Sequence, residues 1–229
     1  MLALANLSFT NLPFSGGLSA TPNGYLMFSI GAAMLYGLLL SSPPSPRRAI
    51  IKTLSIGILA VLAFYIGGPW ALVLALIFSA LGDAFLAYKG DKNFLGGLAS
   101  FLVAHIFYVI LFISQPTESL IFQTPRLVAI VAMLAFCGFM LFKLLPAVGS
   151  LKLPVLAYMS VITIMGVVAM GLDKPVAILG AVMFIASDAI LATEKFLMGE
   201  DHPLRTLSSI AIWTLYYVGQ LLIALAFLA

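Results

Sequence analysis

Long apolar segments separated by short turn-forming stretches constrain the fold of this 229-residue chain. A helix that crosses a bilayer needs about 20 predominantly apolar residues. Eight segments of this kind lie near residues 24–41, 49–67, 70–88, 94–114, 127–145, 153–171, 175–193 and 206–228. The stretches between them are rich in Gly, Pro, Ser and Asn, which favour turns. The pattern predicts an all-α polytopic membrane protein of eight transmembrane helices, with residues 1–229 forming a single transmembrane domain.

The composition agrees with a chain that is surrounded by lipid. Apolar residues make up 63% of the chain and charged residues 8%, whereas roughly a quarter of an ordinary soluble domain is charged. The net charge of +3 comes from a few Lys and Arg residues in short connections, which does not resemble a nucleic-acid-binding surface. We therefore expect membrane lipid and no nucleic acid as a partner. The sequence indicates no particular oligomeric state.

Two local features of the sequence argue against a signal peptide and against disulfides or cysteine-based metal sites. The first twenty residues contain no Lys or Arg, whereas a cleavable signal peptide begins with a basic region. We expect these residues to form a short N-terminal lead, which is either ordered or lies at the membrane interface. Cys137 is the one cysteine of the chain, so an intrachain disulfide and a cysteine-based metal site are both excluded.

The eleven basic residues predict the orientation in the membrane. Only Arg126 and Lys174 lie on one side of the predicted bundle. The others fall in or beside the loops that follow the first, third, fifth and seventh helices: Arg47, Arg48, Lys52, Lys89, Lys92, Lys143, Lys152, Lys195 and Arg205. Basic loops face the cytoplasm, so both termini are expected on the non-cytoplasmic side. The short loops and the absence of targeting motifs favour a bacterial cytoplasmic (inner) membrane.

The two halves of the chain resemble each other weakly. Residues 82–87 align with residues 187–192, and residues 105–109 align with residues 214–218. An offset of four helices preserves direction through the membrane, so the pattern predicts a parallel 4+4 internal repeat with a site at the interface of the halves. The alternative is chance similarity between apolar helices. Four glycines are expected to allow close helix packing: Gly82, Gly96, Gly97 and Gly219.

Two aspartates lie inside apolar segments at matching depths. Asp83 is about 9 Å along its helix from Lys89, and Asp188 occupies the corresponding position of the seventh helix. Ionisable groups at such depth usually face the bundle interior and serve function. Two neighbouring carboxyls in a medium of low dielectric do not readily ionise together, so one can act as an acid and the other as a base. The alternative is that each Asp hydrogen-bonds a neighbouring helix or reaches the interface.

Other polar side chains could complete such a site. His105 lies mid-helix with Tyr108 on nearly the same face, and no second His or Cys lies at a metal-binding spacing, so acid–base work or hydrogen bonding is expected. Lys52 could bind the phosphate of a substrate, or it could simply be one of the basic residues that set the orientation in the membrane. His202 lies in a charged loop and is expected on the surface. Hydrogen bonds or packing are expected from three residues of the last helix: Tyr216, Tyr217 and Gln220.

The candidate site residues and their neighbours occur along the chain in an order that is characteristic of a known family. Residues 79–86 are followed by Phe94, Gly97, Phe101, His105 and Tyr108, then by Ser187-Asp188 and by residues 216–220. The order resembles the lysoplasmalogenase family of eight-helix integral membrane hydrolases. The resemblance implies cleavage of the vinyl ether bond of lysoplasmalogens to a fatty aldehyde and glycerophosphoethanolamine or glycerophosphocholine, with no metal and no organic cofactor. The family typically begins its second helix with Lys-Pro, whereas here Thr53 follows Lys52.

The chemistry of a vinyl ether suggests roles for the site residues. An acid protonates the β-carbon, and water captures the resulting oxocarbenium ion. We expect Asp83 and Asp188 to divide these roles, with His105 orienting one of them. Lys52, Lys89 or Lys92 could contact the phosphate of the lysophospholipid. The further substrate-binding residues that we predict are Tyr108, Ser187, Tyr217 and Gln220.

Two other functions use the same carboxylates. A proton-coupled membrane transporter also places paired carboxyl groups and internal repeats in the membrane. An intramembrane aspartyl protease uses two aspartates and a Gly-x-Gly-Asp motif. Here Ala80 replaces the first glycine of that motif, and no Pro-Ala-Leu run follows.

Overall fold

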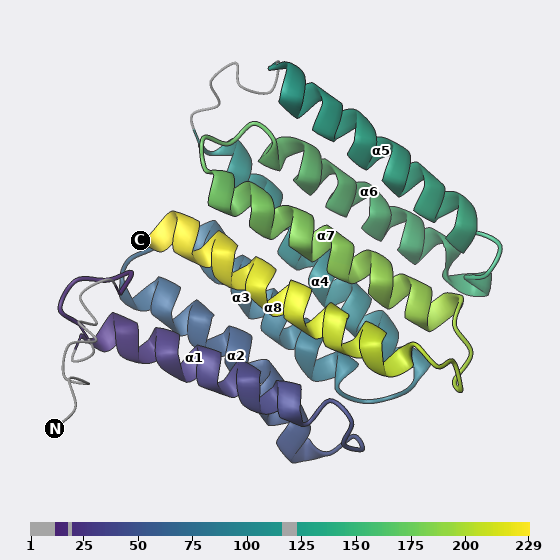
Figure 1. Cartoon of the computed structure of the whole chain (residues 1–229), viewed down its shortest axis with the longest axis horizontal. Helices are drawn as coiled ribbons and strands as arrows, with labels where there is room; N and C mark the ends of the chain where they lie inside the picture. The colour runs from purple at the N-terminus through teal and green to yellow at the C-terminus, as the bar shows by residue number, and fades with distance from the viewer. Residues whose placement is uncertain (1–11, 18–19, 116–122) are drawn as a thin grey trace, which may run out of the picture.

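The computed structural model describes residues 12–17, 20–115 and 123–229, and the helices within these ranges form one elongated bundle (Figure 1). The expected N-terminal lead falls largely outside these residues. The helices are α1 (Thr21–Leu38), α2 (Pro46–Tyr65), α3 (Trp70–Leu86), α4 (Asp91–Ile113), α5 (Thr124–Leu144), α6 (Lys152–Ala169), α7 (Pro175–Phe196) and α8 (Arg205–Leu228), with a short 3-10 turn η4 (Gly149–Leu151) before α6. The described residues contain no strand, which confirms the predicted all-α fold and its eight helices. The assignment of the whole chain to a single domain stays a prediction.

Several helices begin earlier than the apolar pattern predicted. α1 begins at Thr21, α2 at Pro46 and α5 at Thr124, each with a proline at its first or second position. Proline suits the first turn of a helix because its fixed φ is already helical and its missing N–H would have no partner there. A count of apolar residues does not detect this signal, so it placed these helix starts too late.

Among the described residues, six helices are long and apolar enough to cross a membrane, namely α2, α4, α5, α6 with η4, α7 and α8. α3 is equally apolar but has 17 residues. Large apolar side chains point outward from the bundle, as Phe28 and Phe64 do with about three quarters of their surface exposed. Apolar side chains on the outside as well as the inside are typical of helices in lipid. The chain is therefore a polytopic integral membrane protein.

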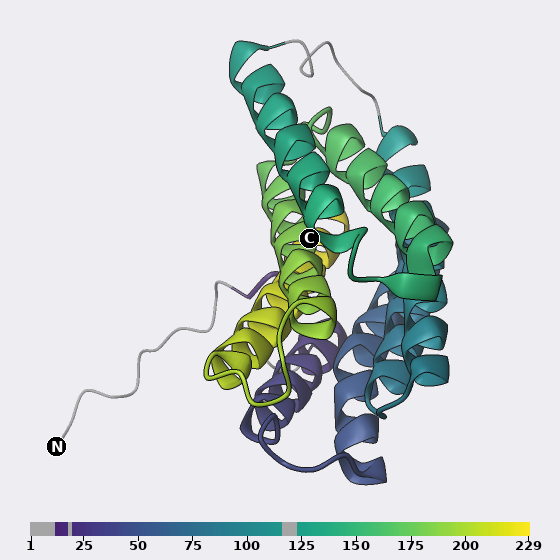
Figure 2. The same ribbon diagram turned by 90° about the vertical axis from the view of Figure 1, so that its right-hand side faces the viewer.

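The helices follow one another around the bundle, apart from α5. α1 packs on α2, α2 on α3, α3 on α4, α4 on α6, α6 on α7, and α7 on α8, which returns to α2 and α1. α5 lies at the periphery against α6 and α7 (Figure 2). The relations among α1 to α4 recur among α5 to α8, which is compatible with the predicted repeat, although the repeat itself stays a prediction.

Glycines bring the helices of two pairs close together, as predicted. A Cβ atom on Gly180 of α7 would lie 2.7 Å from the carbonyl oxygen of Gly219 on α8. A Cβ atom on Gly82 of α3 would lie 2.5 Å from the ring of Phe101 on α4. Small residues allow this approach in membrane proteins. The close contacts fix the α3–α4 and α7–α8 pairs, and α3 and α7 carry the two aspartates.

Candidate active site

A polar cavity of about 410 Å³ opens at one end of the bundle. The loops between α1 and α2, α3 and α4, and α7 and α8 lie at this end, while the start of α1 and the end of α8 lie at the other (Figure 1). Asp83 and Asp188 both line the cavity, so the structure brings together the two aspartates singled out in the sequence. The other polar and charged residues of the lining are Tyr36, Arg48, Lys52, Tyr88, Lys89, Ser187, Glu194, Lys195, Glu200, Arg205, Ser209 and Tyr216.

Asp83 lies on α3 and is bound on both carboxylate oxygens. The Nζ atom of Lys52, from α2, lies 3.1 Å from Oδ1. The hydroxyl of Tyr216, from α8, donates to Oδ2 at 2.8 Å. Asp83 is 1% exposed and the Lys52 side chain 12%, so the pair is almost withdrawn from water. A buried carboxylate is stable only when a cation and hydrogen bonds satisfy it, and Asp83 has both.

Asp188 lies on α7 in a different environment. The hydroxyl of Tyr158, from α6, donates a hydrogen bond to its Oδ2 atom. The Nε2 atom of His105, from α4, is 3.8 Å from the same oxygen, beyond hydrogen-bonding distance. Neither Lys nor Arg forms an ion pair with Asp188 in the described part of the chain. The Asp188 side chain is 14% exposed, so the cavity can reach it.

His105 is held by its own helix. Its Nδ1 atom lies 2.6 Å from the carbonyl oxygen of Phe101. Since a carbonyl only accepts hydrogen bonds, Nδ1 carries a proton. Nε2 is buried, and no described residue forms a hydrogen bond with it. In the neutral ring Nε2 is therefore a free acceptor that faces Asp188.

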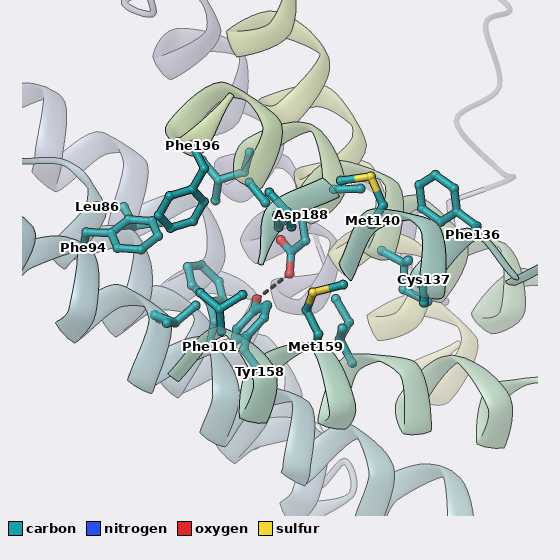
Figure 3. Close-up of a pocket in the computed structure, with 18 residues that line it drawn as sticks. Leu86, Phe94, Phe101, Phe136, Cys137, Met140, Tyr158, Met159, Asp188 and Phe196 are labelled. Carbon is teal, nitrogen blue, oxygen red and sulfur yellow. Dashed lines mark hydrogen bonds between the residues drawn. The ribbon is translucent and has the colours of Figure 1, made fainter. Parts of the chain in front are cut away.

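A second cavity, of about 80 Å³, adjoins Asp188 on its other side. Figure 3 shows apolar side chains around it, with the hydrogen bond from Tyr158 to Asp188 at its wall. Phe136, Cys137 and Met140 of α5 contribute to the lining. Both cavities are lined by Leu86, Phe94, Phe101, Asp188 and Leu191. Asp188 therefore lies where a polar and an apolar compartment meet.

Three residues predicted to contact substrate lie outside the lining of both cavities. Tyr108 donates to Oε1 of Gln220, and Nε2 of Gln220 donates to the Ser79 hydroxyl at 2.8 Å. The Tyr217 hydroxyl lies 2.8 Å from that of Ser29. These contacts connect α8 with α4, α3 and α1. Lys52, Ser187 and Lys89 do line the polar cavity, whereas Lys92 does not.

The sequence analysis missed the roles of two groups. Tyr158 was detectable as a phenol in the middle of an apolar helix. Arg48 appeared only as one member of an Arg-Arg pair that marks topology, and its place in the cavity depends on the tertiary structure. His202 is exposed, as predicted. Within the described residues, no three His, Cys, Asp or Glu side chains converge in the way that a metal site requires.

Comparison with known proteins identifies the relatives of the chain. A lysoplasmalogenase TMEM86A from Homo sapiens is 34% identical over 204 residues, which cover 81% of this chain and 80% of the relative. A lysoplasmalogenase TMEM86B from Rattus norvegicus is 32% identical and covers 86% of this chain and 81% of the relative. A lysoplasmalogenase from Mycobacterium tuberculosis (strain CDC 1551 / Oshkosh) is 29% identical over 161 residues, covering 68% of this chain and 59% of the relative. No solved structure matches the chain significantly.

The relatives confirm the resemblance on which the sequence analysis relied. The model of the YhhN family matches residues 47–227. That range includes all of α3 to α7 and nearly all of α2 and α8, and these helices supply both aspartates, their hydrogen-bonding partners and most of the two cavities. The chain thus belongs to the YhhN family.

Proposed function

We propose that this protein is a lysoplasmalogenase, which hydrolyses the vinyl ether bond of a lysoplasmalogen within the bilayer. The relatives described above are lysoplasmalogenases, which supports this activity. The observation that carries the proposal is the pair of carboxyl groups in one cavity, of which Asp83 is paired with a cation and Asp188 is not. Vinyl ether hydrolysis needs an acid and a base at the same substrate, and the two aspartates can supply them.

Asp188 is the proposed general acid. A carboxyl that is largely withdrawn from water and has no cationic partner favours its neutral form, because the loss of water penalises the charged form. Tyr158 occupies Oδ2, and no described residue forms a hydrogen bond with Oδ1. That oxygen can hold the proton and present it to a substrate at the junction of the cavities.

Asp83 is the proposed carboxylate. Its ion pair with Lys52 and its hydrogen bond from Tyr216 favour the charged form. A fixed negative charge at this place stabilises a cationic intermediate and can accept a proton from water.

The reaction then follows from these charge states. Asp188 transfers its proton to the β-carbon of the vinyl ether, and the C=C electron pair forms the new C–H bond, which leaves an oxocarbenium ion. Water adds to the cationic carbon and loses a proton to Asp83, giving a hemiacetal. The hemiacetal collapses when its C–O bond to glycerol breaks: Asp83 gives its proton to the departing glycerol oxygen, and Asp188 takes the proton of the hemiacetal hydroxyl, which restores the starting state of both residues. The products are a fatty aldehyde and glycerophosphoethanolamine or glycerophosphocholine, with one water consumed.

The surrounding polar residues are proposed to position these groups. The Nε2 atom of His105 lies 3.8 Å from Oδ2 of Asp188, so His105 can help to hold this carboxyl group in place. Ser187 lines the polar cavity beside Asp188 and is a candidate hydrogen-bond donor to the substrate. Tyr108, Tyr217 and Gln220 lie behind the cavity, so we assign them to holding α8 in register with its neighbours.

The two cavities suit the two ends of a lysophospholipid. The polar cavity would take the head group, and the apolar cavity would take the first part of the hydrocarbon chain. α5, which lines the apolar cavity, is the least buried of the candidate spans. The rest of the chain could therefore extend past α5 into the lipid.

The proposed orientation places the polar cavity in the cytoplasmic half of a bacterial cytoplasmic membrane. Arg48, Lys52, Lys89, Lys195 and Arg205 all line the cavity at this end, and the positive-inside rule assigns such an end to the cytoplasm. Reporter domains fused to either terminus test the orientation, since both should report the non-cytoplasmic side.

The decisive test measures aldehyde release by detergent-purified protein without any membrane gradient. We expect cleavage of 1-alkenyl-lysophosphatidylethanolamine and none of its 1-alkyl analogue, which cannot form the oxocarbenium ion by protonation. Asp188→Asn should lower the rate by about 10²–10⁴-fold, the usual contribution of a general acid, and Asp83→Asn should also lose activity. Cleavage of the alkyl analogue, or full activity in Asp188→Asn, would contradict the mechanism. Folded wild-type protein that cleaves neither lipid would contradict the proposed function and favour transport.

A further inference from the structure

Arg48 carries a cationic side chain into the polar cavity without an acidic partner. It lies in the first turn of α2 and lines the cavity. Its Nη2 atom donates to the Tyr36 hydroxyl at 3.3 Å, and its guanidinium carbon lies 5.4 Å from the centre of the Tyr36 ring. Its Nε atom is buried, and no described residue accepts a hydrogen bond from it. The guanidinium is therefore held in place by Tyr36, while some of its donors stay available.

Other cations of the lining are already engaged. Lys52 pairs with Asp83. Lys195 lies 3.4 Å from Asp91, and Arg205 donates to the carbonyl oxygens of Gly199 and Glu194. Lys89 lies in the exposed loop after α3, and no described residue forms a hydrogen bond or an ion pair with its side chain. Within the described residues, Arg48 is thus the cation of the lining that is held in place by another side chain but has no acidic partner.

We propose that Arg48 binds the phosphate group of the lysophospholipid. Lys52, which the sequence suggested as a phosphate ligand, instead balances the charge of Asp83. This inference rests on the proposed function. A guanidinium presents paired N–H donors in a plane that matches the oxygens of a phosphate. Arg48 precedes Lys52 by one helical turn, about 6 Å along α2 toward the loop end. The glycerol carbons of the substrate can span this separation, with the ether carbon beside the aspartates and the phosphate beside Arg48.

Arg47 provides a matched control. It carries the same charge in the same helical turn, so by the positive-inside rule it contributes equally to the orientation in the membrane. It is exposed and does not line the cavity. A difference between substitutions of the two arginines therefore reports the cavity and not the charge of the loop.

The test compares purified wild-type protein with Arg48→Gln and Arg47→Gln on two substrates. One is 1-alkenyl-lysophosphatidylethanolamine, and the other is 1-alkenylglycerol, which has the same vinyl ether and no phosphate. We expect Arg48→Gln to raise KM for the phospholipid about tenfold or more, as the loss of a hydrogen bond to a charged group predicts, with little change in kcat. Cleavage of 1-alkenylglycerol should not change, and Arg47→Gln should match the wild type on both substrates.

A soluble probe gives a second measurement that does not need the neutral substrate to be cleaved. Glycerophosphoethanolamine should inhibit the wild type and Arg47→Gln, and its inhibition constant should rise by a similar factor in Arg48→Gln. Glycerol at the same concentration should inhibit none of them. An inhibition constant that is the same in Arg48→Gln and Arg47→Gln would overturn the proposal, as would a loss in Arg48→Gln that is equal on both substrates. Failure of the wild type to cleave either lipid would count against the proposed function and is distinguishable from these results.

Discussion

Asp83 and Asp188 lie at corresponding positions of α3 and α7, yet their surroundings differ. Asp83 is enclosed by polar groups from α2 and α8, namely Lys52 and Tyr216. Asp188 has the Tyr158 hydroxyl and an apolar cavity on one side and the polar cavity on the other. The comparison shows that the neighbouring helices, and not the residue type, determine which carboxyl is paired with a cation.

The difference has an energetic basis. A buried ion pair is stable only while both partners are present, because removal of either leaves an uncompensated charge. A buried neutral acid requires hydrogen bonds but no counterion. The two aspartates should therefore respond differently to changes in their neighbours.

The largest expected effect concerns the ion pair of Asp83. Lys52→Met should lower the free energy of unfolding by about 3–5 kcal/mol, because the carboxylate stays buried without its cation. The double variant Lys52→Met/Asp83→Asn should recover most of this loss, since both charges are gone. Thermal unfolding in detergent measures both variants.

Asp188→Asn is the matched control for that comparison. The amide oxygen of Asn can still accept from Tyr158, and no cation is left unpaired, so its unfolding temperature should stay near that of the wild type. A double variant as unstable as Lys52→Met would show that the charge pair is not the cause.

The two tyrosines test the charge states directly. Removal of a hydrogen bond to a charged group costs about 1.5–3 kcal/mol, and removal of one between neutral groups about 0.5–1.5 kcal/mol. Tyr216→Phe should thus destabilise the protein more than Tyr158→Phe. Denaturant unfolding of both variants in the same detergent measures the difference. The opposite order would reverse the assignment of acid and base.

The smallest expected effect concerns the apolar cavity. A hexyl chain attached to Cys137 through a disulfide would occupy the space proposed for the substrate chain. The hexyl chain would compete with the hydrocarbon chain of the lipid for the same space, so we expect the apparent affinity for the lipid to fall about tenfold, or about 1.4 kcal/mol. The assay is aldehyde release before and after reduction of the disulfide. Cys137→Ala, which cannot react, is the control, and full activity of the modified protein would place the chain elsewhere.

The sequence was sufficient for the fold class and for selecting the candidate site residues. Long apolar runs require helices in lipid, because a backbone without water must satisfy its hydrogen bonds internally. Asp83, Asp188 and His105 stood out because a polar group is costly in such a run. These conclusions depend on local composition alone.

Pairing across the bundle could not be deduced in this way. The sequence does not indicate that Lys52 meets Asp83, that Tyr158 meets Asp188, or that Arg48 but not Arg47 enters the cavity. It also assigned Tyr108, Tyr217 and Gln220 to the substrate, whereas the described contacts join them to neighbouring helices. The residues in these pairs are far apart in the chain, and which of them meet depends on how the helices are rotated and packed. Local composition therefore determined that this protein lies in the membrane and carries two acids within its apolar helices, and only the tertiary structure determined their partners.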